Sequence, residues 1–156
     1  MQLDKIITQE AVCLNFEAND KTEAIDSLCG FAAKVLGLEK GPILEVVSER
    51  ESLGSTAVGG GVAIPHGKTS LVDTVFLFMA RTAPGFELTD FDSPDGRPVR
   101  LLALLLSPEK PDPDHLKVLA VLGRLWKTPQ NLNLMMAAKD SRSFLETLLS
   151  LTGFSS

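Results

Sequence analysis

Residues 54–68 of the chain read Gly54-Ser55-Thr56-Ala57-Val58-Gly59-Gly60-Gly61-Val62-Ala63-Ile64-Pro65-His66-Gly67-Lys68. Four of the first eight residues are glycine, which lets the backbone adopt positive φ angles and approach other groups closely. Pro65 fixes its own φ and restricts Ile64 to extended geometry, so we expect a short extended segment that ends there. Gly67 then allows a sharp turn. The segment therefore predicts an accessible His66 side chain at the end of a rigid piece of chain.

Three segments around this stretch have the composition of β-strands. Residues 12–16 alternate apolar and polar side chains, as in a half-buried strand. Residues 72–79 are rich in β-branched and aromatic side chains, and residues 99–106 are almost entirely apolar. An apolar run of that length predicts a central strand covered on both faces. The intervening residues 84–98 are polar and contain strong turn signals, so we expect a loop there.

Helices are predicted between and after these strands. Asp20 and Gly37 mark the start and end of a first helix, and a second opens at Gly41-Pro42 and ends near Arg50. A third is capped by Asp112, with Pro113 at its first position and His115 in its first turn. Its buried side is expected to carry Leu116, Leu119, Leu122, Leu125 and Trp126. Shorter helices are expected from Thr128-Pro129 and over residues 143–151.

Strands interleaved with helices indicate the α/β class. We expect one domain over residues 1–156, built as a sandwich with a mixed sheet of about five strands and helices on both faces.

The composition excludes several classes of protein. A net charge of −5 argues against nonspecific binding to nucleic acid, which requires a basic surface. No apolar run reaches the ~20 residues of a membrane span, and the first residues lack the pattern of a signal peptide. Cys13 and Cys29 are too few for a disulfide framework, and we expect both to be buried as small hydrophobic residues. A cytoplasmic protein without direct membrane insertion is predicted.

A nucleotide site is one interpretation of the glycine-rich stretch. Gly67-Lys68-Thr69 resembles the end of a P-loop, but the first glycine of that motif would fall on Val62, and the nearest glycine is Gly61. The residues after Thr69 also favour a strand, whereas a P-loop opens a helix whose N-terminus binds phosphate. The pattern therefore argues against this interpretation.

A metal site is a second interpretation. His66 and His115 are the two histidines of the chain, and Asp112 or Asp114 would have to complete the ligand set. A catalytic zinc site needs three protein ligands and a structural site four, and nothing in the spacing provides them. We expect no metal.

Covalent phosphoryl transfer through His66 is the third interpretation. A neutral imidazole is a good nucleophile near pH 7, and neighbouring glycines let a bulky phosphate-bearing partner approach. The ordinary role of an isolated histidine is that of a hydrogen-bonded core or surface residue. Here Pro65 and Gly67, on either side of it, favour the functional role.

The segment from Arg50 to Gly67 resembles the IIA domain of the mannitol/fructose class in the bacterial phosphoenolpyruvate-dependent sugar phosphotransferase system. That class includes the nitrogen-regulatory IIA protein. The resemblance covers nearly the whole chain, and residues 50–67 are its most specific part. Asp114-His115-Leu116 at a helix start is a second, weaker match.

This resemblance implies that His66 accepts a phosphoryl group from a phosphohistidine of HPr or an HPr-like protein, with Arg50 and His115 beside it. Without the resemblance, we would interpret Arg50 as a solvated residue at a helix end that pairs with Glu49 or Glu51. We would interpret His115 as a residue that forms a local hydrogen bond at a helix N-terminus. Arg50 can hold phosphoryl oxygens with its planar guanidinium, and His115 can donate a hydrogen bond or orient His66. The residues expected around the phosphoryl group are Gly54, Ser55, Thr56, Gly59, Gly60, Gly61 and Gly67.

The chain departs from many relatives of that family at Gly60, where an asparagine is common between two glycines. Lys68 and Thr69 are further candidates for the rim of the site, or else solvated loop residues. The exchange between two phosphohistidines is nearly balanced in energy, so no nucleotide, metal or other cofactor is expected.

The resemblance leaves the biological role open. We expect a stand-alone protein of the nitrogen-regulatory type, which relays the phosphoryl group to a target or signals with it. The alternatives are a fructose- or mannitol-specific transport subunit that passes phosphate to a IIB subunit, and a non-catalytic regulatory binding module.

Overall fold

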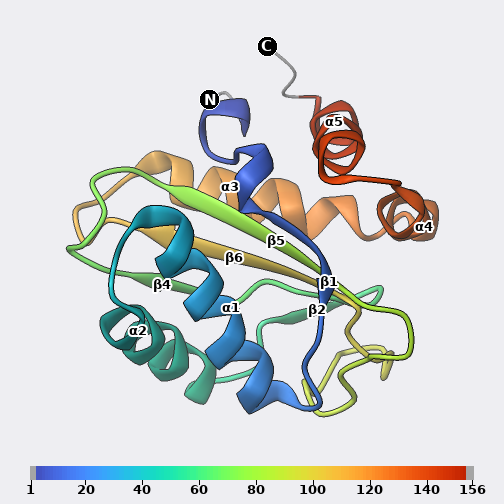
Figure 1. The fold of residues 1–156 in the computed structure, drawn as a ribbon, viewed down its shortest axis with the longest axis horizontal. Coiled ribbons are helices and arrows are strands. Elements are labelled where there is room, and N and C mark those ends of the chain that lie inside the picture. Colours follow the sequence, from blue (N-terminus) through green and yellow to red (C-terminus); the bar gives the residue numbers. More distant parts are fainter. Residues whose placement is uncertain (1–2, 154–156) are drawn as a thin grey trace.

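The computed structural model of the protein describes residues 3–153. Two short 3-10 turns (Leu3–Lys5 and Gln9–Ala11) precede the first strand. The strands are β1 (Val12–Phe16), β2 (Ala57–Gly59), β3 (Val62–Ala63), β4 (His66–Lys68), β5 (Phe76–Thr82) and β6 (Leu101–Ser107). The helices are α1 (Lys21–Leu36), α2 (Lys40–Ser52), α3 (Pro113–Leu125), α4 (Pro129–Ala137) and α5 (Ser141–Thr152) (Figure 1).

The strands form one mixed sheet in the order β1-β5-β6-β3-β2, and β4 pairs with β6 beyond the end of β3. β5 runs antiparallel to β6, whereas β3 and β4 run parallel to it. Val62 lies opposite Leu101 and His66 opposite Leu105, so β3 and β4 follow one another along the same side of β6. All seven residues of β6 are buried, which confirms the predicted central strand.

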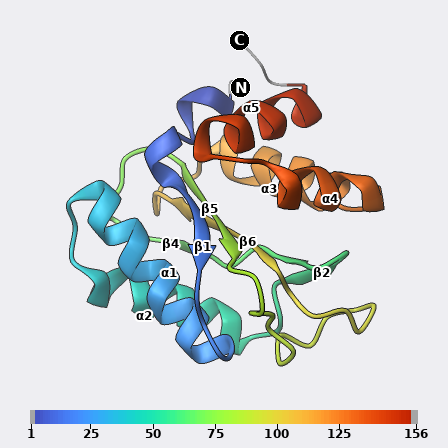
Figure 2. The same ribbon diagram turned by 45° about the vertical axis from the view of Figure 1, so that its right-hand side comes forward.

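Helices cover both faces of this sheet. Helices α1 and α2 lie on one face, and α3, α4 and α5 lie on the other (Figures 1 and 2). The predicted α/β fold with a mixed sheet between two layers of helices is therefore confirmed, with six strands among residues 3–153 where about five were expected.

The predicted helix ends are built from local interactions. The Asp20 carboxylate accepts a hydrogen bond from the Glu23 N–H at the start of α1, and Gly37 ends that helix with a φ of 69°. The Asp112 carboxylate caps α3 by accepting from the Asp114 N–H, with Pro113 in the first turn.

Several sequence-based expectations were wrong in detail. The strand expected over residues 72–79 is β5, and it begins only at Phe76, because the chain bends at Asp73 and Thr74. Val72 and Val75 are buried in the loop that leads to it. Leu116 was expected on the buried side of α3 but is 71% exposed, and Val118 is buried instead. Cys29 is buried as expected, whereas Cys13 is only half-buried. None of the helices in the described part of the chain is long and apolar enough to cross a membrane.

Candidate functional site

The end of α2 and the loop after it place Arg50. Arg50 lies in the last turn of the helix, and its Nη1 donates a hydrogen bond of 2.9 Å to the carbonyl oxygen of Gly54. This bond holds one side of the guanidinium, and among residues 3–153 the structure gives its other N–H groups no hydrogen-bond partner, so they can bind an anion. The guanidinium is close enough to His66 to affect the pKa of that imidazole.

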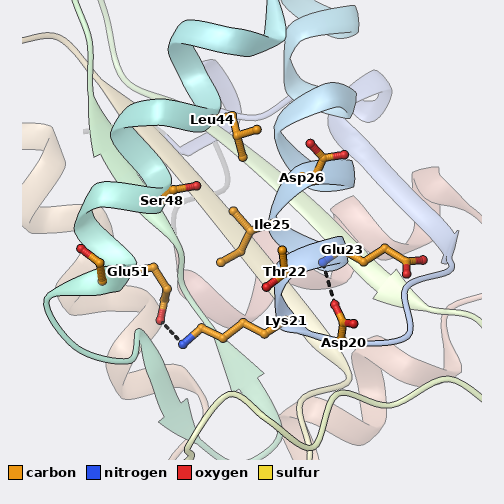
Figure 3. Close-up of a pocket in the computed structure, with 10 residues that line it drawn as sticks. Asp20, Lys21, Thr22, Glu23, Ile25, Asp26, Leu44, Ser48 and Glu51 are labelled. Carbon is orange, nitrogen blue, oxygen red and sulfur yellow. Dashed lines mark hydrogen bonds and ion pairs between the residues drawn. The ribbon is translucent and has the colours of Figure 1, made fainter.

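A buried carboxylate anchors the same loop. Glu51 is 8% exposed and accepts hydrogen bonds from the Thr56 N–H (2.9 Å) and the Thr56 hydroxyl (2.6 Å). Its charge is balanced by Lys21 of α1, whose Nζ lies 2.9 Å from the carboxylate (Figure 3). Ser55 donates to the carbonyl oxygen of Phe91, so the loop is also tied to the segment before β6. These contacts fix residues 54–56 relative to α2 and to the segment before β6.

His66 begins strand β4 and pairs with Leu105 of β6. Its side chain is half-buried, and Nδ1 lies 2.8 Å from the carbonyl oxygen of Ile64. A carbonyl oxygen only accepts hydrogen bonds, so Nδ1 must carry the proton in this contact. The neutral ring therefore presents Nε2 as the nitrogen with a free lone pair.

His115 reaches the same region from helix α3. It lies in the first turn of α3, is 8% exposed, and its Nδ1 lies 2.5 Å from the hydroxyl oxygen of Ser107. The two imidazole centroids are 5.8 Å apart, with an angle of 65° between the ring planes. The carboxyl end of β6 thus brings the two histidines together.

Both imidazoles favour the neutral form at pH 7. Burial lowers the pKa of His66 below its ordinary value, and the Arg50 and Lys68 cations lower it further, against the Ile64 carbonyl and Glu51, which raise it. Burial also lowers the pKa of His115, together with His66 and Lys68, whereas Asp112 raises it. A neutral, partly exposed imidazole beside a guanidinium is suited to attack an electrophile that carries negative charge.

Gly67 has a different role from the one expected. It lies within β4 and makes no sharp turn. A Cβ at this position would lie 2.9 Å from Cγ2 of Val46 and 3.2 Å from the backbone nitrogen of Val47. Glycine is therefore needed because α2 packs directly against the strand that carries His66.

The structure does not bring Gly59, Gly60 and Gly61 to His66. Gly59 ends β2, and Gly60 and Gly61 form the turn to β3, where the Gly60 N–H donates to the Asp95 carboxylate at 2.8 Å. The Arg100 N–H donates to the Gly61 carbonyl, next to the start of β6. His66 pairs four residues further along β6 than Val62, about 13 Å at the usual rise of a strand. Gly54, Ser55 and Thr56 lie in the loop that holds Arg50.

Lys68 and Thr69 differ from each other in their surroundings. Lys68 is exposed on β4, and its charge reaches both histidines. Thr69 is 4% exposed, its N–H donates to the Ser107 carbonyl at 2.9 Å, and its hydroxyl accepts from the Leu71 N–H. Thr69 therefore fixes the chain after β4, and no helix begins at Gly67-Lys68-Thr69 as a P-loop requires.

One groove of the structure is not lined by Arg50, His66 or His115. It has a volume of about 750 Å³ and lies between α1 and α2 (Figure 3). Glu51 and Lys21 line it, but they are paired with each other there. The candidate site is instead the surface around His66.

A protein-family model matches nearly the whole chain. Residues 5–150 match the family model described as phosphoenolpyruvate-dependent sugar phosphotransferase system, EIIA 2. The chain belongs to this EIIA 2 family. It is therefore a IIA-type phosphocarrier, a class of proteins that take part in phosphoryl transfer between proteins.

Similar EIIA 2 proteins have both regulatory and transport names. The chain is 37% identical over 148 residues to a nitrogen regulatory protein of Bradyrhizobium diazoefficiens, covering 95% of each chain. It is 33% identical over 123 residues to a fructose-specific EIIA component of Haloferax volcanii, covering 78% of each. The crystal structure of the nitrogen regulatory protein IIA-Ntr from Neisseria meningitidis superposes with a TM-score of 0.85 at 29% identity, covering 94% of this chain and 98% of the other.

Sequence reasoning missed three residues that shape this EIIA site. Glu51 was considered only as a partner of Arg50, whereas it anchors Thr56. Lys21 gave no signal, because its contact with Glu51 joins residues 30 positions apart. Ser107 is the one polar residue of the apolar strand β6. A polar residue at the end of a buried apolar strand was the signal in the sequence that could have indicated it.

Proposed function

We propose that His66 is the phosphoacceptor of this EIIA protein and that Nε2 is the reacting atom. The observation that supports this proposal is the contact of Nδ1 with the Ile64 carbonyl at 2.8 Å. This contact places the proton on Nδ1 and leaves the Nε2 lone pair available. Burial keeps the pKa of His66 below its ordinary value, so the nucleophilic form predominates at pH 7.

The transfer step exchanges one phosphorus–nitrogen bond for another. The Nε2 lone pair of His66 attacks the phosphorus of a phosphohistidine on the donor protein. The new P–N bond forms as the donor's P–N bond breaks, and the donor imidazole leaves with the electron pair. Because both states are phosphohistidines, the step needs no nucleotide and no metal to supply energy.

Arg50 and His115 stabilise the charge on the transferred group in this proposal. The phosphoryl group spreads negative charge over three oxygens, so its transfer depends mainly on positioning and electrostatic stabilisation. Arg50 is held by Gly54, and its other N–H donors have no hydrogen-bond partner in the described part of the chain. The ring centre of His115 lies 5.8 Å from that of His66. Lys68 adds positive charge at the rim.

HPr or an HPr-like carrier is the proposed donor, and a regulatory target protein is the proposed recipient of the phosphoryl group or the signal. The likeness to two nitrogen regulatory proteins supports this role. The alternative is a sugar transport subunit that passes the phosphoryl group to a IIB subunit, which the likeness to a fructose-specific EIIA component supports. A protein that only binds its targets, with phosphorylation as a switch, is the third possibility.

Labelling tests the phosphoacceptor directly. The protein is incubated with labelled phosphoenolpyruvate, the first enzyme of the system and HPr, and we expect acid-labile phosphate on His66. His66→Gln should remain unlabelled, whereas His115→Gln should be labelled more slowly. The absence of label on the wild type, or equal labelling of His66→Gln, would contradict the proposal.

A pull-down separates the proposed roles. Wild-type protein, phosphorylated or not, is compared with His66→Gln as bait. Recovery of a kinase or an ion transporter in one phosphorylation state supports regulation, and recovery of a IIB or permease subunit supports sugar transport.

A further inference from the structure

Ser107 is a buried hydroxyl residue that the phosphoryl-transfer scheme above does not use. It is the last residue of β6 and is 0% exposed. Its carbonyl oxygen accepts a hydrogen bond of 2.9 Å from the Thr69 N–H, and its backbone pairs with Lys68 of β4. Its hydroxyl oxygen lies 2.5 Å from Nδ1 of His115. The sheet therefore holds this hydroxyl in a fixed place behind the His115 ring.

The burial of Ser107 determines which atom carries the proton. A hydroxyl has one hydrogen to donate, and among residues 3–153 His115 Nδ1 is the partner that the structure gives it. If Nδ1 carried the proton, the buried O–H would have no acceptor, which is costly. If the hydroxyl donates to Nδ1, both groups are satisfied. The neutral His115 ring then carries its proton on Nε2.

We propose that Ser107 is a positioning residue that holds His115 with its Nε2–H directed to the phosphoryl group on His66. The proposal rests on the function proposed above, because it assigns the role of His115 in the same site. Nδ1 is bound to β6, so Nε2 lies on the ring edge away from the sheet residue. From there it can donate a hydrogen bond to a phosphoryl oxygen, which Nδ1 cannot.

The two histidines are thereby fixed in opposite tautomers. The Ile64 carbonyl keeps a proton on Nδ1 of His66 and leaves Nε2 as a nucleophile. The Ser107 hydroxyl donates to Nδ1 of His115 and leaves Nε2–H as a donor. The group that binds Nδ1 of His115 belongs to β6, and the group that binds Nδ1 of His66 belongs to the segment just before β4. The fold itself therefore assigns the two histidines their different roles.

Nitrogen NMR of the unphosphorylated wild-type protein tests the tautomers without any variant. With ¹⁵N-labelled histidine above pH 7.5, we expect His115 to show an unprotonated Nδ1 and a protonated Nε2, and His66 to show the reverse. A protonated Nδ1 on His115 would overturn the proposal. This measurement does not depend on phosphorylation, so a protein with the expected tautomers and no phosphoryl transfer would refute the proposed function and leave the tautomer assignment standing.

Removing the hydroxyl should change the titration of His115. The hydroxyl donates to the neutral ring, so Ser107→Ala should raise the pKa of His115. The other charged groups that face this ring are His66 and Lys68 on β4 and Asp112 before α3, and the substitution leaves them in place. An unchanged titration of His115 in Ser107→Ala would contradict the proposed hydrogen bond.

A double-mutant cycle tests whether Ser107 acts through His115. Loss of one aligned hydrogen bond predicts that Ser107→Ala slows phosphoryl transfer from HPr about tenfold. In a His115→Ala background the same change should slow it less than about twofold. Ser150→Ala removes an exposed hydroxyl on α5 and should leave the rate unchanged. Equal slowing by Ser107→Ala in both backgrounds would assign Ser107 a purely structural role and overturn the inference.

Discussion

The carboxylate of Glu51 accepts two hydrogen bonds from Thr56, one from its N–H at 2.9 Å and one from its hydroxyl at 2.6 Å. Thr56 in turn accepts a hydrogen bond from the Ile64 N–H, two residues before His66. The end of α2, which carries Arg50, and the segment that carries His66 are thus joined through one buried side chain. The relative position of the guanidinium and the imidazole depends on this link.

Glu51→Gln should therefore destabilise the protein. The amide keeps the shape of the side chain but cannot accept both hydrogen bonds in the same way, and it removes the charge that faces Lys21. We expect a loss of about 1–3 kcal/mol in the free energy of unfolding. Urea unfolding measures it. Glu49→Gln makes the same change on an exposed turn of α2 and should stay within about 0.5 kcal/mol. Equal effects of the two substitutions would show that Glu51 does not anchor the loop.

Local signals in the sequence were sufficient for most of the fold. The two ends of α1 were predictable from Asp20 and Gly37, because each acts through contacts with residues close to it in the chain. The apolar run of β6 marked the central strand because burial on both faces demands it.

Strand β4 was not predictable in the same way. His66-Gly67-Lys68 has no strand pattern, and it is extended because it pairs with β6 nearly forty residues later in the chain. The glycines of the β2–β3 turn were assigned to the site because they are close to His66 in sequence. In the structure, strand β3 lies between these glycines and His66. The pattern of apolar and polar residues in the sequence does not reveal this separation.

Gly67→Ala tests the close approach of α2 to β4. The added methyl group would overlap Val46 and the adjacent backbone of α2, so β4 or α2 must move. We expect a loss of about 1–3 kcal/mol in stability and slower phosphorylation, because His66 is the neighbouring residue on the strand. Gly123→Ala is the matched control, since it lies within α3 and the added Cβ would meet no atom within 4 Å beyond its chain neighbours and the helix's own backbone. It should stabilise the helix by about 0.5–1 kcal/mol. Similar stability changes in both variants would contradict the packing argument.

Gly60→Asn introduces the side chain that the family resemblance leads us to expect between the two neighbouring glycines. In this chain Gly60 has a φ of 65°, and a Cβ there would lie 2.8 Å from the carbonyl oxygen of Trp126. Asparagine tolerates the backbone conformation but not this contact, so we expect thermal unfolding to show a loss of about 1–3 kcal/mol. Gly96→Asn has a similar φ of 73° and open space around it, and should cost about 1 kcal/mol or less. Because the turn lies away from His66, the rate of phosphorylation should stay the same. A faster rate in Gly60→Asn would show that the turn reaches the site.

Arg50→Ala should slow phosphoryl transfer by about 10²-fold or more, the usual effect of losing one donor aimed at a transition state. Arg50→Lys should recover only part of that loss, because an ammonium group cannot bind two oxygens with planar geometry. Rapid-quench measurement of transfer from phosphorylated HPr gives the rates. Arg142→Ala removes an exposed arginine paired with Glu146 on α5 and is the control for net charge. A change below about threefold in Arg50→Ala would remove Arg50 from the site.

The two histidines should make stability fall as the pH falls below their ordinary pKa of 6.5. Burial lowers the pKa of both rings in the folded protein below the ordinary value of 6.5. Between the ordinary and the lowered value the unfolded chain binds protons that the folded protein does not, so stability falls as the pH falls through this window.

Replacing both rings with glutamine should flatten this dependence, because the titrating groups are gone. Urea unfolding of the wild type and of the His66→Gln, His115→Gln double variant at pH 5, 6, 7 and 8 provides the comparison, and the curves should run parallel above pH 7. Asp95 and Asp140 also have lowered pKa values, but those carboxylates lose their contribution only below their ordinary value of 3.8, outside this window. Equal slopes for both proteins between pH 7 and 5 would show that the folded protein does not keep these imidazoles neutral, and the nucleophilic form of His66 would then need another source.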